Sequence, residues 1–79
     1  MSNINLKEAL LVEGWGIHFT FNGLLCGVEV EVHNAIPSFE SWCGNKSKKY
    51  IDVDELIHDK FFDGNSLQEL ENIVRFSFH

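Results

Sequence analysis

The chain has 79 residues, 44% of them hydrophobic, and it contains seven Phe, two Trp and one Tyr. So much apolar and aromatic material excludes a disordered chain, and the length allows one compact domain spanning residues 1–79. Twelve acidic and six basic residues give a net charge of −6, which repels phosphate backbones and argues against direct binding to nucleic acid.

The first predicted element is a short helix between Asn5 and Gly14. Asn5 is a good N-cap, and Glu8 stands three residues later, as in a capping box. Gly14 is a natural stop for the helix. One face of the helix carries an apolar stripe, made of Leu6, Leu10 and either Val12 or Glu13.

A β-hairpin follows. Residues 15–21 alternate strictly between apolar side chains and small or polar ones, and Asn22-Gly23 favours a type I′ turn, which needs positive φ at both central residues. A two-residue loop fixes the register, and the second strand continues to His33. The predicted inward pairs are Phe21–Leu24, Phe19–Cys26, Ile17–Val28 and Trp15–Val30.

Two further strands are predicted after Pro37. Ser38 to Cys43 forms the third strand, which places Phe39 and Trp42 on opposite faces of the sheet. Lys48 to Ile51 forms a short fourth strand, and its lysines suit an edge position.

The last part of the chain predicts two helices and a closing strand. Asp52 and Ser66 are N-caps, and the apolar stripes of the two helices are Val53, Leu56, Ile57 and Phe61, then Leu67, Leu70 and Ile73. Residues 74–78 alternate as a strand that pairs with the first hairpin. Its Phe76 and Phe78 are expected to join Trp15, Phe19 and Phe21 in the core. The predicted fold is α+β: an antiparallel sheet of four to five strands with two to three short helices packed on one face.

The segment between the two helices resembles a calcium loop in outline, since Asp59, Asp63 and Asn65 stand near a glycine. Counted from Asp59, however, ligand positions 3, 9 and 12 fall on Phe61, Leu67 and Leu70, which offer no side-chain oxygen. We therefore interpret Asp63-Gly64 as a corner between helices.

The outward face of the hairpin carries the candidate metal ligands. His18 lies on the first strand, and Glu29, Glu31 and His33 alternate along the second. Imidazoles and carboxylates ligate zinc when three or four of them converge, so a small metal-binding protein or enzyme is one hypothesis. The alternative interpretation is that these are the solvated residues of a half-exposed sheet.

The leading functional hypothesis is a non-enzymatic binding protein that docks on a larger protein partner, as an inhibitor, immunity or regulatory protein does. The candidate contact surface combines acids and apolar side chains, namely Glu29, Glu31, Leu25, Phe39 and Trp42. Self-association through an exposed edge strand is a third possibility. No cofactor is expected.

Cys26 and Cys43 are too few for a disulfide framework, and Cys43 is the one candidate nucleophile. No basic, apolar and small-residue sequence typical of a signal peptide opens the chain, and no apolar run approaches the ~20 residues that span a bilayer. These features predict a cytoplasmic protein with reduced thiols and no membrane association.

Overall fold

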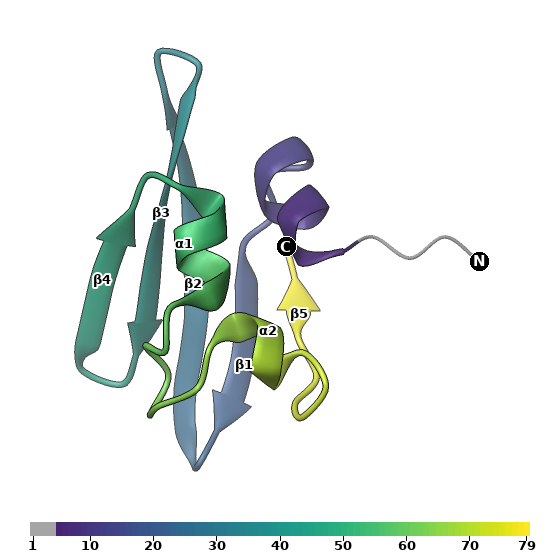
Figure 1. The fold of residues 1–79 in the computed structure, drawn as a ribbon, viewed down its shortest axis with the longest axis vertical. Coiled ribbons are helices and arrows are strands. Elements are labelled where there is room, and N and C mark those ends of the chain that lie inside the picture. The colour runs from purple at the N-terminus through teal and green to yellow at the C-terminus, as the bar shows by residue number, and fades with distance from the viewer. Residues whose placement is uncertain (1–4) are drawn as a thin grey trace.

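The computed structural model describes residues 5–79, which form one five-stranded antiparallel sheet with short helices, as predicted (Figure 1). The spatial order of the strands is β4-β3-β2-β1-β5. In chain order the elements are the π-helix η1 (Glu8–Val12), β1 (Ile17–Phe21), β2 (Leu24–His33), β3 (Ile36–Cys43), β4 (Lys46–Tyr50), α1 (Val53–His58), α2 (Leu67–Leu70) and β5 (Ser77–Phe78).

The first hairpin has the predicted register over most of its length. Phe21 pairs with Leu24, Phe19 with Cys26 and Ile17 with Val28, and the turn residues Asn22 and Gly23 have φ of 53° and 76°. The predicted Trp15–Val30 pair is wrong, because β1 begins only at Ile17. The main-chain N–H of Trp15 instead donates to Ala9 O at 3.0 Å, which ties it to the end of the first helix.

The core lies between the sheet and the helices. In Figure 1, α1 and α2 lie in front of the sheet, and the side chains that alternate towards them are buried. Leu6 and Leu10 join the same core from the first helical segment, whereas Val12 is 71% exposed. The buried cluster contains Ile17, Phe19, Cys26, Val28 and Phe39 from the sheet, and Val53, Leu56, Ile57, Leu67 and Leu70 from α1 and α2.

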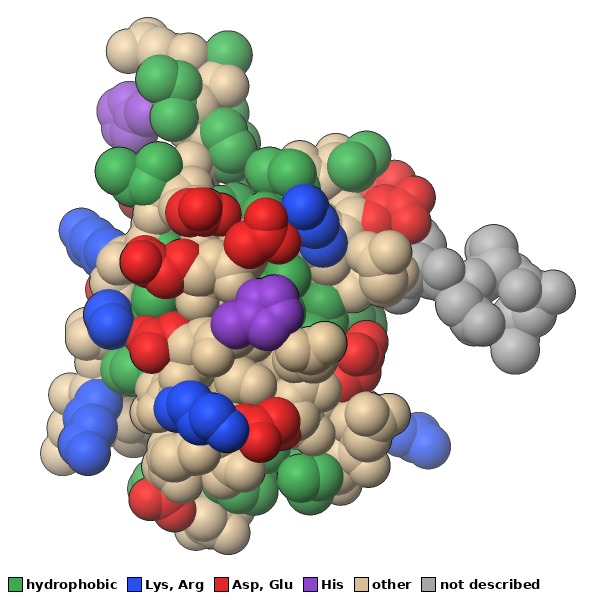
Figure 2. Space-filling view, viewed as in Figure 1, with side chains coloured by type: hydrophobic (Ala, Val, Ile, Leu, Met, Phe, Trp, Pro, Cys, Tyr) green, Lys and Arg blue, Asp and Glu red, His purple; other side chains and the backbone are tan. Residues whose placement is uncertain are grey.

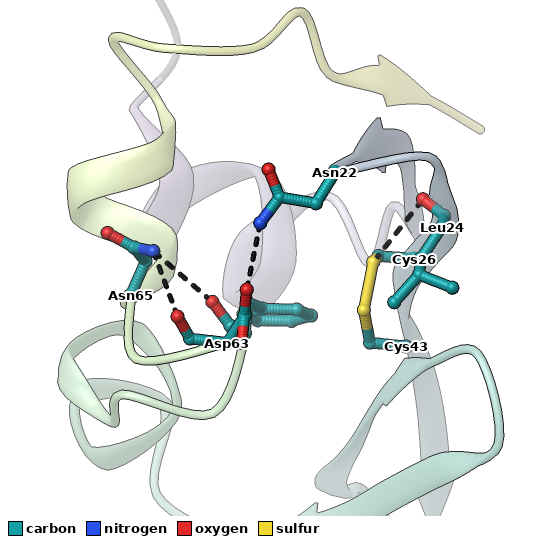
Figure 3. The surroundings of a disulfide bond; sticks show 7 residues. Asn22, Leu24, Cys26, Cys43, Asp63 and Asn65 are labelled. Carbon is teal, nitrogen blue, oxygen red and sulfur yellow. Dashed lines mark hydrogen bonds between the residues drawn. A yellow bond between two sulfur atoms is a disulfide. The ribbon is translucent and has the colours of Figure 1, made fainter.

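The corner between α1 and α2 is built as the sequence predicts. Asp63 and Gly64 have φ of 53° and 83°, and Phe62 and Asn65 exchange main-chain hydrogen bonds of 2.9 and 3.0 Å across them. Ser66 then caps α2 in a complete capping box. Asn22 Nδ2 donates to Asp63 Oδ2 at 2.8 Å, which links this corner to the β1–β2 turn (Figure 3).

The end of the chain differs in detail from the prediction. β5 pairs with β1 as expected, but it is only two residues long. Phe76 packs on Phe19 with ring centroids 5.0 Å apart, whereas Phe78 is 43% exposed and contacts Trp15 at the rim of the core. Ile73 is 62% exposed, since α2 ends three residues before it.

Cys26 and Cys43 form a disulfide, so the expectation of reduced thiols is wrong (Figure 3). The two residues are directly opposite each other on β2 and β3, with Cα atoms 4.1 Å apart. Their pairing depends on the register of the β2–β3 hairpin, which was not predicted from the sequence.

Across residues 5–79, no helix combines the length and the apolar character that crossing a membrane requires.

Reducing the disulfide is expected to lower the free energy of unfolding. A cross-link that closes a loop of 17 residues removes chain entropy from the unfolded state, which corresponds to ~3 kcal/mol. Urea denaturation with and without reductant measures the difference, and a Cys26→Ala/Cys43→Ala variant serves as the control that reductant does not affect. If an alkylating reagent modifies both cysteines in the native protein without prior reduction, the two cysteines are free thiols and the disulfide is contradicted.

Asp59 joins the end of α1 to the edge strand β4. Its Oδ2 accepts hydrogen bonds from Lys48 Nζ at 2.8 Å and from the buried Tyr50 hydroxyl at 2.6 Å. The hydrogen bond from Lys48, followed by that from Tyr50, lowers the pKa of the Asp59 carboxyl below its ordinary value. The ionised carboxylate is therefore favoured by folding.

An Asp59→Asn variant is expected to be less stable than the parent protein at neutral pH. Because the folded-state pKa of Asp59 lies below its unfolded value, the stabilisation is present above the unfolded pKa and is lost as pH falls through the folded one. The difference in unfolding free energy should thus shrink between about pH 5 and pH 2, measured by urea denaturation. Glu71→Gln is the control, because the Glu71 carboxylate is exposed and forms no ion pair within residues 5–79. A pH-independent difference argues against this role.

Candidate functional site

The candidate site lies on the sheet face opposite α1 and α2. Side chains alternate along a strand, so the residues between the buried ones point away from the helices. The outward set on the three central strands includes His18 on β1, Leu25, Gly27, Glu29 and Glu31 on β2, and Glu40 and Trp42 on β3. Figure 2 shows the helix side, where acidic and basic side chains are intermingled.

His18, Glu29 and Trp42 converge on this face. His18 Nε2 lies 3.3 Å from Glu29 Oε2, and the indole Nε1 of Trp42 donates to the same oxygen at 3.4 Å. The His18 and Trp42 rings meet edge to face with centroids 5.4 Å apart. The Glu29 carboxylate is therefore held between an imidazole and an indole.

Gly27 makes this arrangement possible. It is directly opposite both His18 on β1 and Trp42 on β3. A Cβ atom at this position would lie 2.6 Å from Trp42 Cζ2 and 2.9 Å from His18 Cδ2, and it would also collide with the Ile17 carbonyl oxygen. Because Gly27 has no side chain, the two rings can lie over the β2 backbone.

His79 reaches the same place from beyond β5. It exchanges main-chain hydrogen bonds of 2.8 and 3.0 Å with Gly16, and its ring centroid lies 4.0 Å from that of His18. One ligand atom from each of His18, Glu29 and His79 lies within 4.8 Å of the others. His79 is not among the site residues predicted from the sequence, although the alternation of residues 74–79 places it on the outward face.

Glu31 and His33 do not join this cluster, although both belong to the metal set predicted from the sequence. Residues four apart on a strand are separated by about 13 Å, so Glu29 and His33 cannot reach one ion. His33 lies instead at the exposed end of β2, where Figure 1 shows the β2–β3 hairpin projecting beyond the helices. The structure brings together only His18 and Glu29 of the four.

An acidic hollow lies beside the cluster. It has a volume of about 410 Å³, and its lining includes Glu29, Glu31, Ser38, Glu40 and Lys49. Glu29 is directly opposite Glu40 in the β2–β3 ladder, and Glu40 is opposite Lys49 on β4. Within residues 5–79, Glu31 and Glu40 take part in no ion pair.

Two apolar side chains, Leu25 and Trp42, lie on the same open face but outside the lining of the hollow. Leu25 is 62% exposed on β2, and Trp42 is half-buried on β3. Phe39 is only 2% exposed and lies in the core, so its ring is not available to a partner. Figure 2 also shows apolar side chains on the projecting hairpin, where Val32 and Ile36 are exposed.

No family model matches this chain, and no match was found among curated proteins or solved structures.

A Gly27→Ala substitution is expected to displace the His18 and Trp42 rings. Adding a methyl group where no space exists typically costs about 1–3 kcal/mol of stability. Urea denaturation and near-ultraviolet circular dichroism measure the loss of stability and the change around tryptophan. Ser47→Ala, at an exposed position opposite Trp42, is the control. An alanine variant with unchanged spectrum and stability contradicts this packing.

Proposed function

We propose that this protein is a non-enzymatic binding module that docks its open sheet face on a basic surface of a larger protein. Inhibitor, immunity and regulatory proteins act in this way. The observation that carries the proposal is the acidic hollow of Glu29, Glu31 and Glu40, which shares the open sheet face with the half-buried Trp42 and the exposed Leu25.

The charges of the hollow support a cationic partner. Like charges directly opposite each other on antiparallel strands destabilise a sheet by a few tenths of a kcal/mol to about 1 kcal/mol. Glu29 and Glu40 form such a pair, and Glu31 adds a third carboxylate on the same face. Lysine or arginine side chains of a partner would relieve this repulsion, and complementary charge also accelerates encounter and rejects acidic partners.

The apolar residues support a contact with a protein surface. Stable interfaces combine a central aromatic or aliphatic anchor with a polar rim, and Trp is among the commonest anchors. The indole of Trp42 is already oriented by Glu29 and His18, so little conformational entropy is lost when it is covered. Leu25 extends the apolar part of this surface along β2.

The disulfide affects two other expectations, a catalytic role for Cys43 and a cytoplasmic location. Cys43 is bonded to Cys26, so it does not present the free thiolate that nucleophilic catalysis needs. Disulfides are typical of oxidising compartments, so the cytoplasmic location that reduced thiols would favour is not part of this proposal.

The test compares two variants of equal net charge. Glu31→Lys/Glu40→Lys reverses two charges in the hollow, and Glu13→Lys/Glu71→Lys reverses two exposed acids elsewhere. A partner is captured from the producing cells, purified, and titrated with each variant by calorimetry over a range of salt concentrations. The hollow variant is expected to bind at least about tenfold more weakly, a loss of ~1.4 kcal/mol, and the control variant should bind like the parent protein.

The free hollow variant should be about as stable to urea as the parent, because Glu40→Lys removes the repulsion with Glu29 but places a lysine opposite Lys49 on β4. Weak binding then reflects the lost contact and not a damaged fold. Equal loss of affinity in both variants, or a purified partner whose contact surface is acidic, contradicts docking through this face.

A further inference from the structure

We propose that His18, Glu29 and His79 form a binding site for one divalent zinc-type metal ion, with the fourth coordination position open. This inference goes beyond the docking proposal and does not depend on it. The site differs from the four-residue set predicted from the sequence, because His79 replaces Glu31 and His33.

The separations of the ligand atoms suit a tetrahedral ion. With zinc bonds of 2.0–2.2 Å to nitrogen and oxygen, two ligand atoms on a tetrahedron lie roughly 3.4 Å apart. His18 Nε2 and Glu29 Oε2 are 3.3 Å apart, which is already this edge length. The third ligand atom, on His79, lies within 4.8 Å of both, so a small rotation of one exposed imidazole closes the set.

The donor types select the metal. Two imidazole nitrogens and one carboxylate form a ligand set found at zinc sites that keep an open position for water or substrate. Magnesium and calcium prefer sites made of oxygen ligands, so this set disfavours them. A water molecule or a partner's side chain would occupy the fourth position.

The surrounding residues hold the ligands in place. The missing side chains of Gly16 and Gly27 provide the space for the two imidazoles: a Cβ on Gly16 would lie 3.0 Å from His79 Nε2. The main-chain pairing of His79 with Gly16 fixes its position beside β1, independently of its ring. Trp42 Nε1 donates to the Glu29 carboxylate, as partners of metal ligands commonly do.

The location favours entry of a cation. The side chains of His18 and Glu29 are 45% and 51% exposed, so an ion can reach them from solvent. The neighbouring Glu31 and Glu40 carboxylates give the site a negative surround. In the absence of an ion, His18 and Glu29 form an exposed pair, which contributes at most about 1 kcal/mol and is readily replaced.

The experiment titrates the untagged, disulfide-intact protein with zinc chloride by calorimetry in a buffer that does not chelate metal. We expect one ion per chain, a raised melting temperature and no comparable binding of magnesium or calcium. Cobalt chloride reports the geometry, because four-coordinate Co²⁺ has intense visible absorption. His18→Ala, Glu29→Gln and His79→Ala should each weaken zinc binding at least about tenfold. Removing a residue that only orients a metal ligand already costs about tenfold in affinity, and removing the ligand itself should cost no less.

His33→Ala is the matched control, since His33 is also exposed on the sheet but lies outside the cluster. His79→Ala keeps both main-chain hydrogen bonds to Gly16, so circular dichroism should show an intact fold. The proposal is overturned by absence of saturable zinc binding, by one ion per two chains, or by equal losses in His33→Ala and His79→Ala.

The Glu31→Lys/Glu40→Lys variant separates this site from the docking surface, because it keeps all three ligands. Zinc bound with one-to-one stoichiometry by this variant supports a site that is independent of docking. Loss of its zinc binding, with an intact fold, contradicts the three-residue assignment.

Discussion

The pairing register of β1, β2 and β3 is the constraint on which the rest of the structure depends. A shift of one residue would exchange the two faces of the sheet. In the observed register Phe19, Cys26 and Cys43 share the buried face, where the disulfide and the helices complete the core. The same register places His18, Gly27 and Trp42 in one row on the open face, so core and site have a common origin.

The open face combines features that stabilise the free protein poorly. Glu29 and Glu40 are like charges directly opposite each other, and Leu25 is exposed to solvent. Gly27 lies in the middle of β2 and has no side chain that could pack against its neighbours. Glycine in a strand often marks a close approach of another group, and here the groups are two aromatic rings. A small domain has little stability to spare, and the concentration of these unfavourable features on one face is the reason that the docking proposal uses this face.

Local signals predicted the parts of the fold that depend on neighbours in sequence. The Asn22-Gly23 turn, the Asp63-Gly64 corner and the Ser66 capping box each depend on a few adjacent residues, and all three are confirmed. The errors occur where distant segments compete. Trp15 leaves the β1 ladder because its N–H bonds to Ala9, and Phe78 stays at the rim because β5 is only two residues long. Of the candidate site, alternation placed His18 and Glu29 on the outward face but did not distinguish them from Glu31 and His33.

The sequence by itself determined the hairpin register and which face of β1 and β2 is apolar, because turn chemistry and two-residue periodicity act locally. Tertiary structure alone decided that Cys26 meets Cys43, that Phe39 is buried while Trp42 covers Gly27, and that His79 joins His18 and Glu29. The β2–β3 register is set by a two-residue turn, Asn34-Ala35, with φ of 52° and 64°. Alanine rarely adopts positive φ, so the sequence does not signal this turn as Asn22-Gly23 signals the first one. His79 reaches His18 and Glu29 only through the pairing of the chain end with Gly16, which joins segments far apart in the sequence.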